Sequence, residues 1–352
     1  MSSTNNPQPT SVLEAKAPAF TTAEAERIAK RGFGVVGEAE CLRSERDQNF
    51  HLRTREGREW VLRISNPAED PAVVDFQTRA LLHIARVDPE LAIPHLLTTP
   101  DGSPTHEVDG PDGRRFITRM LSFLPGKLLN DAQPTPQLLR EVGATTAKLA
   151  RSLRGFFHPA ARHELLWDLT QVPLLQARTR HIEEPAHRRL VEHVFDHLIE
   201  QVLPVLGGFR AQVIHNDVSC QNTLVDGDRV TGVIDFGDLI HAPLVCDIAV
   251  PVSELIVDPG DPIEAAMAVV AGYHGVTPFT ADELRVVFDL VTTRLAMMIA
   301  ISAWRAGDHP ENIEYITAGV EENWLMLERL VEFGPDFFHA GLRHACGLPA
   351  SA

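Results

Sequence analysis

The stretch VIHNDVSCQNTLV (213–225) is followed closely by GVIDFGD (232–238). Each stretch starts with apolar residues that are typical of a buried strand, and each then turns strongly polar. A simple turn needs only one or two polar residues. The number of polar residues in these two stretches therefore predicts loops that carry chemistry.

The polar residues have the spacing H-x-D-x-x-x-x-N followed by D-F-G, an arrangement used for phosphoryl transfer. A magnesium–nucleotide complex needs hard oxygen ligands, which Asn222 and Asp235 would supply. An alcohol acceptor needs a carboxylate that orients it and takes its proton, a role predicted for Asp217. We expect His215 to brace the loop by hydrogen bonds. The alternative is a polar hairpin that matches by chance in both halves.

Length, composition and charge limit the class of protein. With 352 residues the chain can form a large core and two lobes. A net charge of −16 argues against a nucleic-acid partner, which would need a basic face. Neither a secretory leader nor an unbroken apolar run of about 18 residues is visible, so we expect a cytoplasmic protein without a membrane partner. The pattern leaves the oligomeric state undetermined.

The chain divides into two regions of different pattern. Residues 1–19 have the character of a disordered tail, and residues 20–119 alternate short strands with helices expected at 21–34 and 71–87. A hinge is expected at 120–126. Residues 127–352 are mostly helical, with helices at 135–153 and 187–203 and others that begin at Ile263, Ala281 and Asn312. This predicts an α+β, bilobal, protein-kinase-like fold with a small β-rich N-lobe and a large helical C-lobe.

A kinase also needs a cation for the nucleotide phosphates on a strand of its first lobe. The matching strand WVLRI (60–64) offers Arg63 where a lysine is usual, and its expected partner is Asp75 on the following helix. The segment SERDQNF (44–50) lies between two expected strands, so Ser44 and Gln48 are the predicted donors to the phosphates.

One motif points away from nucleotide binding. Residues 32–37 match G-x-G-x-x-G, but they follow a helix instead of a strand. We therefore interpret them as the C-terminal stop of that helix.

The two loop motifs resemble the signatures of the aminoglycoside phosphotransferase and choline kinase superfamily, a small-molecule branch of the protein-kinase-like fold. CDIAV (246–250) follows in place of an A-P-E activation segment, and the resemblance implies that Asp247 braces the active-site loops. Further stretches resemble the hydroxylysine kinase family: SERDQNF (44–50), WVLRISNP (60–67), DFQ (75–77), RMLSFLPG (119–126), FHP (157–159), LLWDLTQVPLL (165–175) and HPENIEYI (309–316).

This second resemblance implies transfer of a nucleotide γ-phosphate to the 5-hydroxyl of 5-hydroxy-L-lysine. GTP is the donor named for that family, whereas the sequence does not choose between GTP and ATP. Two residues depart from the pattern. Asn216 stands where glycine is more usual, and Arg63 replaces lysine.

An amino-acid acceptor would need a cation for its carboxylate and acids for its amines. The candidates for the acceptor site are Asp168, Asp238, Glu254 and Arg294, and the nucleotide base is expected near Met120 and Phe123. Homoserine, choline, ethanolamine and aminoglycosides are alternative acceptors. An inactive pseudokinase that acts as a binding module and a protein kinase are alternative classes, although the missing activation segment argues against the last.

Overall fold

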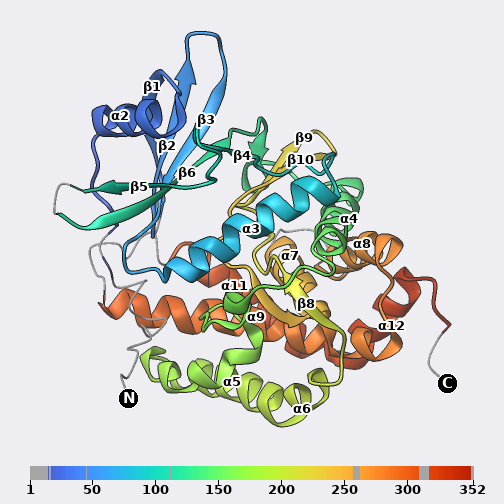
Figure 1. Ribbon diagram of the computed structural model, residues 1–352. Coiled ribbons are helices and arrows are strands. Elements are labelled where there is room, and N and C mark those ends of the chain that lie inside the picture. Colours follow the sequence, from blue (N-terminus) through green and yellow to red (C-terminus); the bar gives the residue numbers. More distant parts are fainter. Residues whose placement is uncertain are drawn as a thin grey trace. The chain divides into compact units, whose positions relative to one another are not determined.

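The structure is a computed structural model that describes residues 15, 17–44, 46–110, 113–256, 262–308 and 317–349 (Figure 1). Its contacts divide the chain into two compact units. Unit 1 comprises residues 1–125 and 157–164, and unit 2 comprises residues 126–156 and 165–352. Unit 1 is rich in strands and unit 2 is mostly helical, which confirms the α+β, bilobal fold class. The sequence pattern placed residues 157–164 in the helical lobe, but they pack with unit 1.

Unit 1 is built on one antiparallel sheet with the order β1-β2-β3-β6-β4, and β5 also pairs with β6. The described residues of this unit form two α-helices, and α2 contributes its apolar face to a core with the sheet (Figure 1). The elements are α2 (Thr22–Phe33), β1 (Gly37–Leu42), β2 (Gln48–Thr54), β3 (Glu59–Ile64), α3 (Pro71–Val87), β4 (Leu96–Leu97), β5 (His106–Asp109), β6 (Arg115–Ser122) and the 3₁₀ helix η2 (Pro159–Arg162).

The ends of α2 follow directly from its sequence. Thr21 and Glu24 form a capping box at its start, which satisfies backbone donors that a helix leaves open. Gly34 ends the helix with φ 70°, a left-handed conformation that costs glycine little. The G-x-G-x-x-G stretch is therefore a helix stop, as expected, and Gly34 is the residue within it that makes the cap.

Successive side chains along the strands of unit 1 point to opposite faces of the sheet. Leu62 and Ile64 of β3 lie in the core with α2, so Arg63 between them points to the opposite face. In the strand register Arg63 stands opposite Asn49 of β2 and Arg119 of β6. The face away from α2 thus carries polar and charged side chains.

Unit 2 combines long helices with short strand pairs. β8 (Ala211–Ile214) pairs with β11 (Ile240–Pro243), and β9 (Thr223–Asp226) lies between β10 (Arg229–Val233) and β7 (Lys127–Leu128). Its described residues form the α-helices α4 (Pro136–Ser152), α5 (Pro185–His197), α6 (Leu203–Leu206), α7 (Ala249–Leu255), α8 (Pro262–Val276), α9 (Ala281–Asp308), α11 (Val320–Phe333) and α12 (Pro335–Ala345). The shorter turns are η1 (Leu129–Asp131), η3 (Leu169–Leu174), η4 (Gln176–His181), the π-helical η5 (Leu198–Val202) and η6 (Leu244–Ile248).

The helices expected from sequence periodicity in unit 2 are present, with two differences. The helix expected at 187–203 begins at Pro185 and changes to a π-turn at Leu198. The helix expected to begin at Asn312 falls partly outside the described residues, and α11 is described from Val320.

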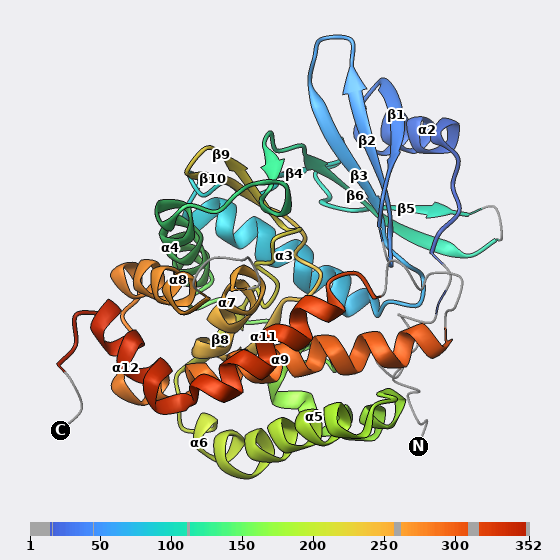
Figure 2. The same ribbon diagram turned by 180° about the vertical axis from the view of Figure 1, so that it is seen from behind.

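α9 is the central helix of unit 2 and packs beside α11 (Figure 2). By length and composition residues 281–307 of α9 could cross a membrane, since an 18-residue window within them has a mean hydropathy of 1.7. However, 78% of that window is buried inside the protein. This burial is what the core helix of a folded unit requires.

α4 and α8 cross at a contact that only glycine allows. A Cβ at Gly143 would lie 1.9 Å from the carbonyl oxygen of Val269, and one at Gly272 would lie 2.0 Å from that of Arg140. Both obstacles are backbone atoms, so a larger residue must push the helices apart.

We predict that Gly143→Ala lowers the free energy of unfolding by about 1–3 kcal/mol, the usual cost of overpacking a core. Gly275→Ala is the matched control on α8, because no described atom lies within 4 Å of its Cβ position. There alanine should be neutral or stabilise by up to about 1 kcal/mol, through its better helix propensity. Chemical denaturation measures the free energy of unfolding of both variants. Equal changes in the two would contradict the close contact between α4 and α8 at Gly143.

Candidate active site

The loop between β8 and β9 brings the predicted chemistry together within unit 2. Asn222 donates from Nδ2 to Oδ2 of Asp217 at 2.5 Å and to the carbonyl oxygen of Asp217 at 3.2 Å. The N–H of Ile234 donates to the carbonyl oxygen of Asn222 at 2.8 Å, which brings Asp235 beside the same loop. Asp235 in turn accepts the N–H of Gly237 at 3.0 Å. Asp217 and Asn222 are therefore hydrogen-bonded to each other, and Asp235 directly follows the residue whose N–H is bonded to Asn222.

Both loops contain a residue in the left-handed region. Asn216 has φ 65° and Asp235 has φ 56°, and in the described part of the chain these are the non-glycine residues with positive φ. Asparagine and aspartate tolerate this region better than other non-glycine residues. The conformation explains why glycine is usual at position 216 and why asparagine can replace it.

Buried hydrogen bonds hold Asn216 in this conformation. Its N–H donates to Oδ1 of Asp247 at 2.8 Å, and its Nδ2 donates to the carbonyl oxygen of Trp167 at 3.3 Å. Asp247 is fully buried. Burial raises the pKa of Asp247 to about 7, although the N–H groups of Asn216 and His215 act in the opposite direction. This geometry agrees with the bracing role that the sequence resemblance implied for Asp247.

His215 is fully buried under the loop. Its Nδ1 accepts the N–H of Asp217 at 3.3 Å, and its ring meets the edge of Phe236 with 4.7 Å between centroids. Burial lowers the pKa of His215 to about 4, against the opposite effect of Asp235 and Asp238. The imidazole is therefore neutral at pH 7, as a side chain that braces the loop should be.

Negative charge is concentrated around Asp217. Burial raises the pKa of Asp217 well above its usual value, and the carboxylates of Asp238, Glu254 and Asp235 raise it further. The guanidinium of Arg294 opposes them, with Nη2 at 3.7 Å from Oδ1 of Asp217. Four carboxylates around one guanidinium leave an excess of negative charge. Such a site suits a divalent cation and the amines of a substrate.

Arg294 is a buried residue of α9. Its Nη1 donates to the carbonyl oxygen of Trp167 at 3.1 Å, and its guanidinium lies over the Trp167 ring at 4.6 Å. Glu254 of α7 accepts the N–H of Cys220 at 2.6 Å, so it contacts the loop between β8 and β9. The predicted acceptor residues Arg294, Glu254 and Asp238 are thus electrostatic neighbours of Asp217.

Asp168 has a different environment from the other predicted acceptor residues. Its carboxylate caps η3 by accepting the N–H and hydroxyl of Thr170, and it also accepts from Nε2 of Gln171. A capping role accounts for its burial. Contact between Asp168 and an acceptor stays a prediction.

In unit 1 the partner of Arg63 differs from the expected one. Nε of Arg63 donates to Oδ2 of Asp47 at 2.5 Å. Asp75, the expected partner, instead pairs with Arg79 at 2.8 Å and with His158 at 3.0 Å. α3 directs Asp75 toward η2. The partner of Arg63 is therefore Asp47, on the loop between β1 and β2.

The other residues predicted for the nucleotide have defined positions within unit 1. Gln48 exchanges two hydrogen bonds of 2.8 Å with the backbone of Phe20, and Ser44 is exposed. Met120 is fully buried in the core with α2, while Phe123 stacks on His51 at 4.1 Å. Their contacts with a nucleotide stay predictions.

Asp47 is the residue that sequence reasoning missed. A hairpin that pairs Asn49 with Arg63 places position 47 one step further along the same face, diagonal to Arg63. The turn at 55–57 fixes this register, so counting back from it would have found the acid.

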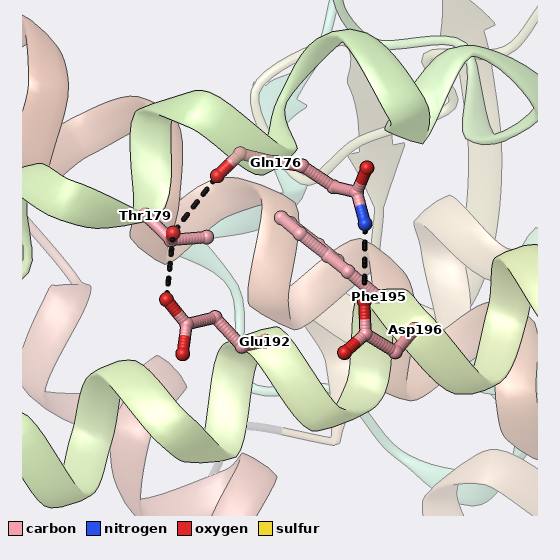
Figure 3. Close-up of a pocket in the computed structure, with 5 residues that line it drawn as sticks. All are labelled: Gln176, Thr179, Glu192, Phe195 and Asp196. Atoms are coloured by element: carbon pink, nitrogen blue, oxygen red, sulfur yellow. Dashed lines mark hydrogen bonds between the residues drawn. The ribbon is translucent and has the colours of Figure 1, made fainter.

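A cavity of about 250 Å³ lies between η4 and α5, away from the predicted site residues (Figure 3). Gln176 donates to Asp196 at 3.0 Å and Thr179 donates to Glu192 at 3.2 Å, so both acids of its wall are hydrogen-bonded there. Its lining residues do not belong to the loop between β8 and β9, and we assign the cavity no role in the chemistry.

A strand-rich unit with a cation on β3, together with a helical unit that carries these two loops, defines a kinase-like small-molecule phosphotransferase. Residues 40–286 match the model of the phosphotransferase enzyme family. The chain belongs to this family, and its reaction is phosphoryl transfer to an alcohol group.

Known proteins show which members of the family the chain is similar to in sequence and in fold. The chain is 28% identical to the hydroxylysine kinase of Mus musculus over 341 residues, which cover 90% of this chain and 91% of that protein. It is 28% identical to the homoserine kinase of Methylobacillus flagellatus over 245 residues, which cover 67% and 69%. The solved structure of an amicoumacin kinase, in complex with AMP-PNP, Ca²⁺ and Ami, has the same fold with a TM-score of 0.65, 13% identity and coverage of 86% and 94%.

We predict that the left-handed conformation of residue 216 dominates its tolerance to substitution. Asn216→Gly should change the free energy of unfolding by less than about 1 kcal/mol, because relief of strain offsets the lost side-chain bond. Asn216→Ala should cost about 1–2 kcal/mol more than glycine does, since a Cβ disfavours this region. Denaturant unfolding of both variants checks the order, which equal stability would contradict.

Proposed function

We propose that this protein transfers the γ-phosphate of ATP or GTP to the hydroxyl of an amino-alcohol acceptor, with 5-hydroxy-L-lysine as the leading candidate. The observation that carries the proposal is the bonded cluster of Asp217 and Asn222 beside Asp235. The similarity to hydroxylysine kinases over 90% of the chain supports the choice of acceptor.

Asp217 is the proposed catalytic base. Its side chain is 23% exposed, and Asn222 and Arg294 contact its two oxygens from different sides. A carboxylate held in this way can orient an acceptor hydroxyl and take its proton while the phosphoryl group moves in line. His215, neutral and buried, keeps the loop in place.

Asn222 and Asp235 are the proposed ligands of Mg²⁺, and their environment fits that ion. The amide nitrogen of Asn222 is turned toward Asp217, so its oxygen points away and can bind a cation. Few protein ligands are expected, because Mg²⁺ in such sites binds one or two side chains together with phosphate oxygens. When bound, Mg²⁺ would neutralise the charge on the transferring phosphate.

The donor nucleotide is proposed to meet unit 1 through Arg63, with the segment 44–50 covering the phosphates. Ser44 is an exposed hydroxyl donor, whereas Gln48 anchors the start of β2 to Phe20. Met120 and Phe123 remain the proposed neighbours of the base, whereas Asp75 pairs with His158.

The acceptor side combines one cation with several acids. Arg294 would bind the carboxylate of an amino acid, while Glu254 and Asp238 would bind its amines, with Asp168 nearby in the chain segment that contacts Arg294. Hydroxylysine carries two amines and one carboxylate, which matches this balance. Homoserine, with one amine, is the alternative supported by the homoserine kinase relative.

We predict that Asp217→Asn lowers kcat by about a hundredfold or more, the usual effect of losing a general base. Asp226→Asn, at the exposed end of β9, is the control and should keep normal kcat. Steady-state assays of nucleoside diphosphate release measure both variants. Near-normal turnover by Asp217→Asn would rule out its role as base.

The experiment that tests the proposal is an assay of nucleoside diphosphate release with Mg²⁺, with ATP and GTP in parallel. The acceptors are 5-hydroxy-L-lysine, homoserine, choline, ethanolamine and an aminoglycoside. We expect selective stimulation by hydroxylysine. Stimulation by another acceptor would keep the kinase and replace the substrate, whereas bound nucleotide without turnover for any acceptor would favour a pseudokinase.

We predict that Arg294→Lys raises the KM for hydroxylysine about tenfold, because a bidentate charged contact is worth about 1.5–3 kcal/mol. The decarboxylated analogue of the same acceptor is the matched control, and its KM should change less than about twofold because it lacks the carboxylate that Arg294 binds. An equal rise in KM for both acceptors would mean that Arg294 does not act through the acceptor carboxylate.

A further inference from the structure

Two arginines stand side by side on the face of the unit 1 sheet that points away from α2. Arg63 of β3 and Arg119 of β6 are direct cross-strand partners. Arg119 is buried, and the Arg63 side chain is only 14% exposed. Like charges placed directly opposite each other destabilise a sheet. A nearby negative group is therefore required.

Asp47 supplies this negative group from the loop between β1 and β2. Its Oδ2 accepts from Nε of Arg63 at 2.5 Å, and its Oδ1 accepts the N–H of Asn66 at 2.8 Å. The side chain of Asn66 returns a bond of 3.0 Å to the carbonyl oxygen of Arg46. The end of the loop is thus cross-linked to the chain segment that follows β3.

The charges around Asp47 keep it ionised. Burial acts to raise its pKa, but the guanidinium groups of Arg63 and Arg119 and the N–H of Asn66 together lower it. Glu69 and Arg46 also lie within electrostatic range, and burial raises the pKa of Glu69. These five groups comprise three cations and two acids, so the cluster retains an affinity for anions.

α3 contributes no acid to this cluster. Gln77 of α3 accepts from Nη2 of Arg119 at 3.1 Å, and Ser65 accepts from the same nitrogen at 3.3 Å. The acid on α3, Asp75, is bonded to His158 and Arg79. The usual pairing of a strand cation with an acid on the following helix is therefore replaced by a pairing with a loop acid.

We propose that Asp47 is the positioning residue of the donor site: it holds the guanidinium of Arg63 in the orientation that binds the nucleotide phosphates. This inference rests on the proposed role of Arg63. A carboxylate bonded to Nε fixes the plane of a guanidinium, and a fixed plane lets its fork meet phosphate oxygens with less loss of entropy. Arg119 supports this arrangement because its positive charge keeps Asp47 ionised.

The test compares Asp47→Asn with Asp47→Glu and Arg63→Met in the full-length protein. Asp47→Asn should raise the nucleotide KM about tenfold or more, given about 1.5–3 kcal/mol for a charged hydrogen bond, while the acceptor KM changes by less than about twofold. Binding of a fluorescent ATP analogue, measured without acceptor, should weaken by the same factor. Asp47→Glu, which keeps the charge, should restore part of the loss.

The control is Glu107→Gln, which breaks an exposed carboxylate–arginine pair with Arg115 on the same sheet. It should leave both KM values unchanged. Adding Asp47→Asn to Arg63→Met should cause no further loss, because both act through the same guanidinium. If Asp47→Asn fails to fold, Asp47→Ser, which also removes the charge, carries the test, and an unchanged nucleotide KM in that variant would contradict the positioning role.

The outcomes separate this inference from the proposed function. If Arg63→Met raises the nucleotide KM but the Asp47 variants do not, the positioning role is wrong and the donor site stands. If Arg63→Met leaves nucleotide binding unchanged, the proposed donor site itself is wrong. If Asp75→Asn impairs nucleotide binding and Asp47→Asn does not, the helix acid pairs with Arg63 in the working enzyme.

Discussion

The hydrogen bond from the backbone N–H of Asn216 to the buried carboxylate of Asp247 is the constraint on which the candidate active site depends. It holds residue 216 in a left-handed conformation that an asparagine would otherwise rarely adopt. Asp217 directly follows residue 216 in the loop, and the side chain of Asn222 donates a hydrogen bond to the carboxylate of Asp217. A single buried acid from η6 therefore controls the direction of the proposed base and of one proposed metal ligand.

The candidate site concentrates negative charge. This arrangement is unfavourable for stability, and the proposed function explains it. Carboxylates of Asp217, Asp235, Asp238 and Glu254 repel one another, and burial adds to the penalty. Arg294 compensates for only part of this charge. A protein stabilises such a cluster with rigid surrounding packing and retains the excess charge where a cation is to bind. The proposed donor side in unit 1 has the opposite character, since the buried Arg119 and the partly buried Arg63 both lie near Asp47 there.

Local patterns in the sequence predicted most of the fold and indicated the loops on which the candidate site lies. The strand periodicity, the cap of α2 and the spacing of the two loops are determined by neighbouring residues, and the structure has them. The partner of Arg63, the capping role of Asp168 and the packing of residues 157–164 on unit 1 depend on register and on contacts distant in sequence. With 32 basic and 48 acidic residues in the chain, the charge pattern offers too many possible pairs to choose among. Strand register was the one signal that could have identified Asp47.

The most direct test of this account is a crystal structure of the protein with Mg²⁺, a non-hydrolysable nucleotide and 5-hydroxy-L-lysine. We predict Mg²⁺ about 2.0–2.1 Å from the oxygens of Asn222 and Asp235, as is usual for this ion. We also predict the acceptor hydroxyl about 2.6–3.2 Å from the carboxylate of Asp217, within reach for proton transfer. A metal bound away from Asn222 and Asp235, or an acceptor hydroxyl directed away from Asp217, would contradict the proposed roles of these residues.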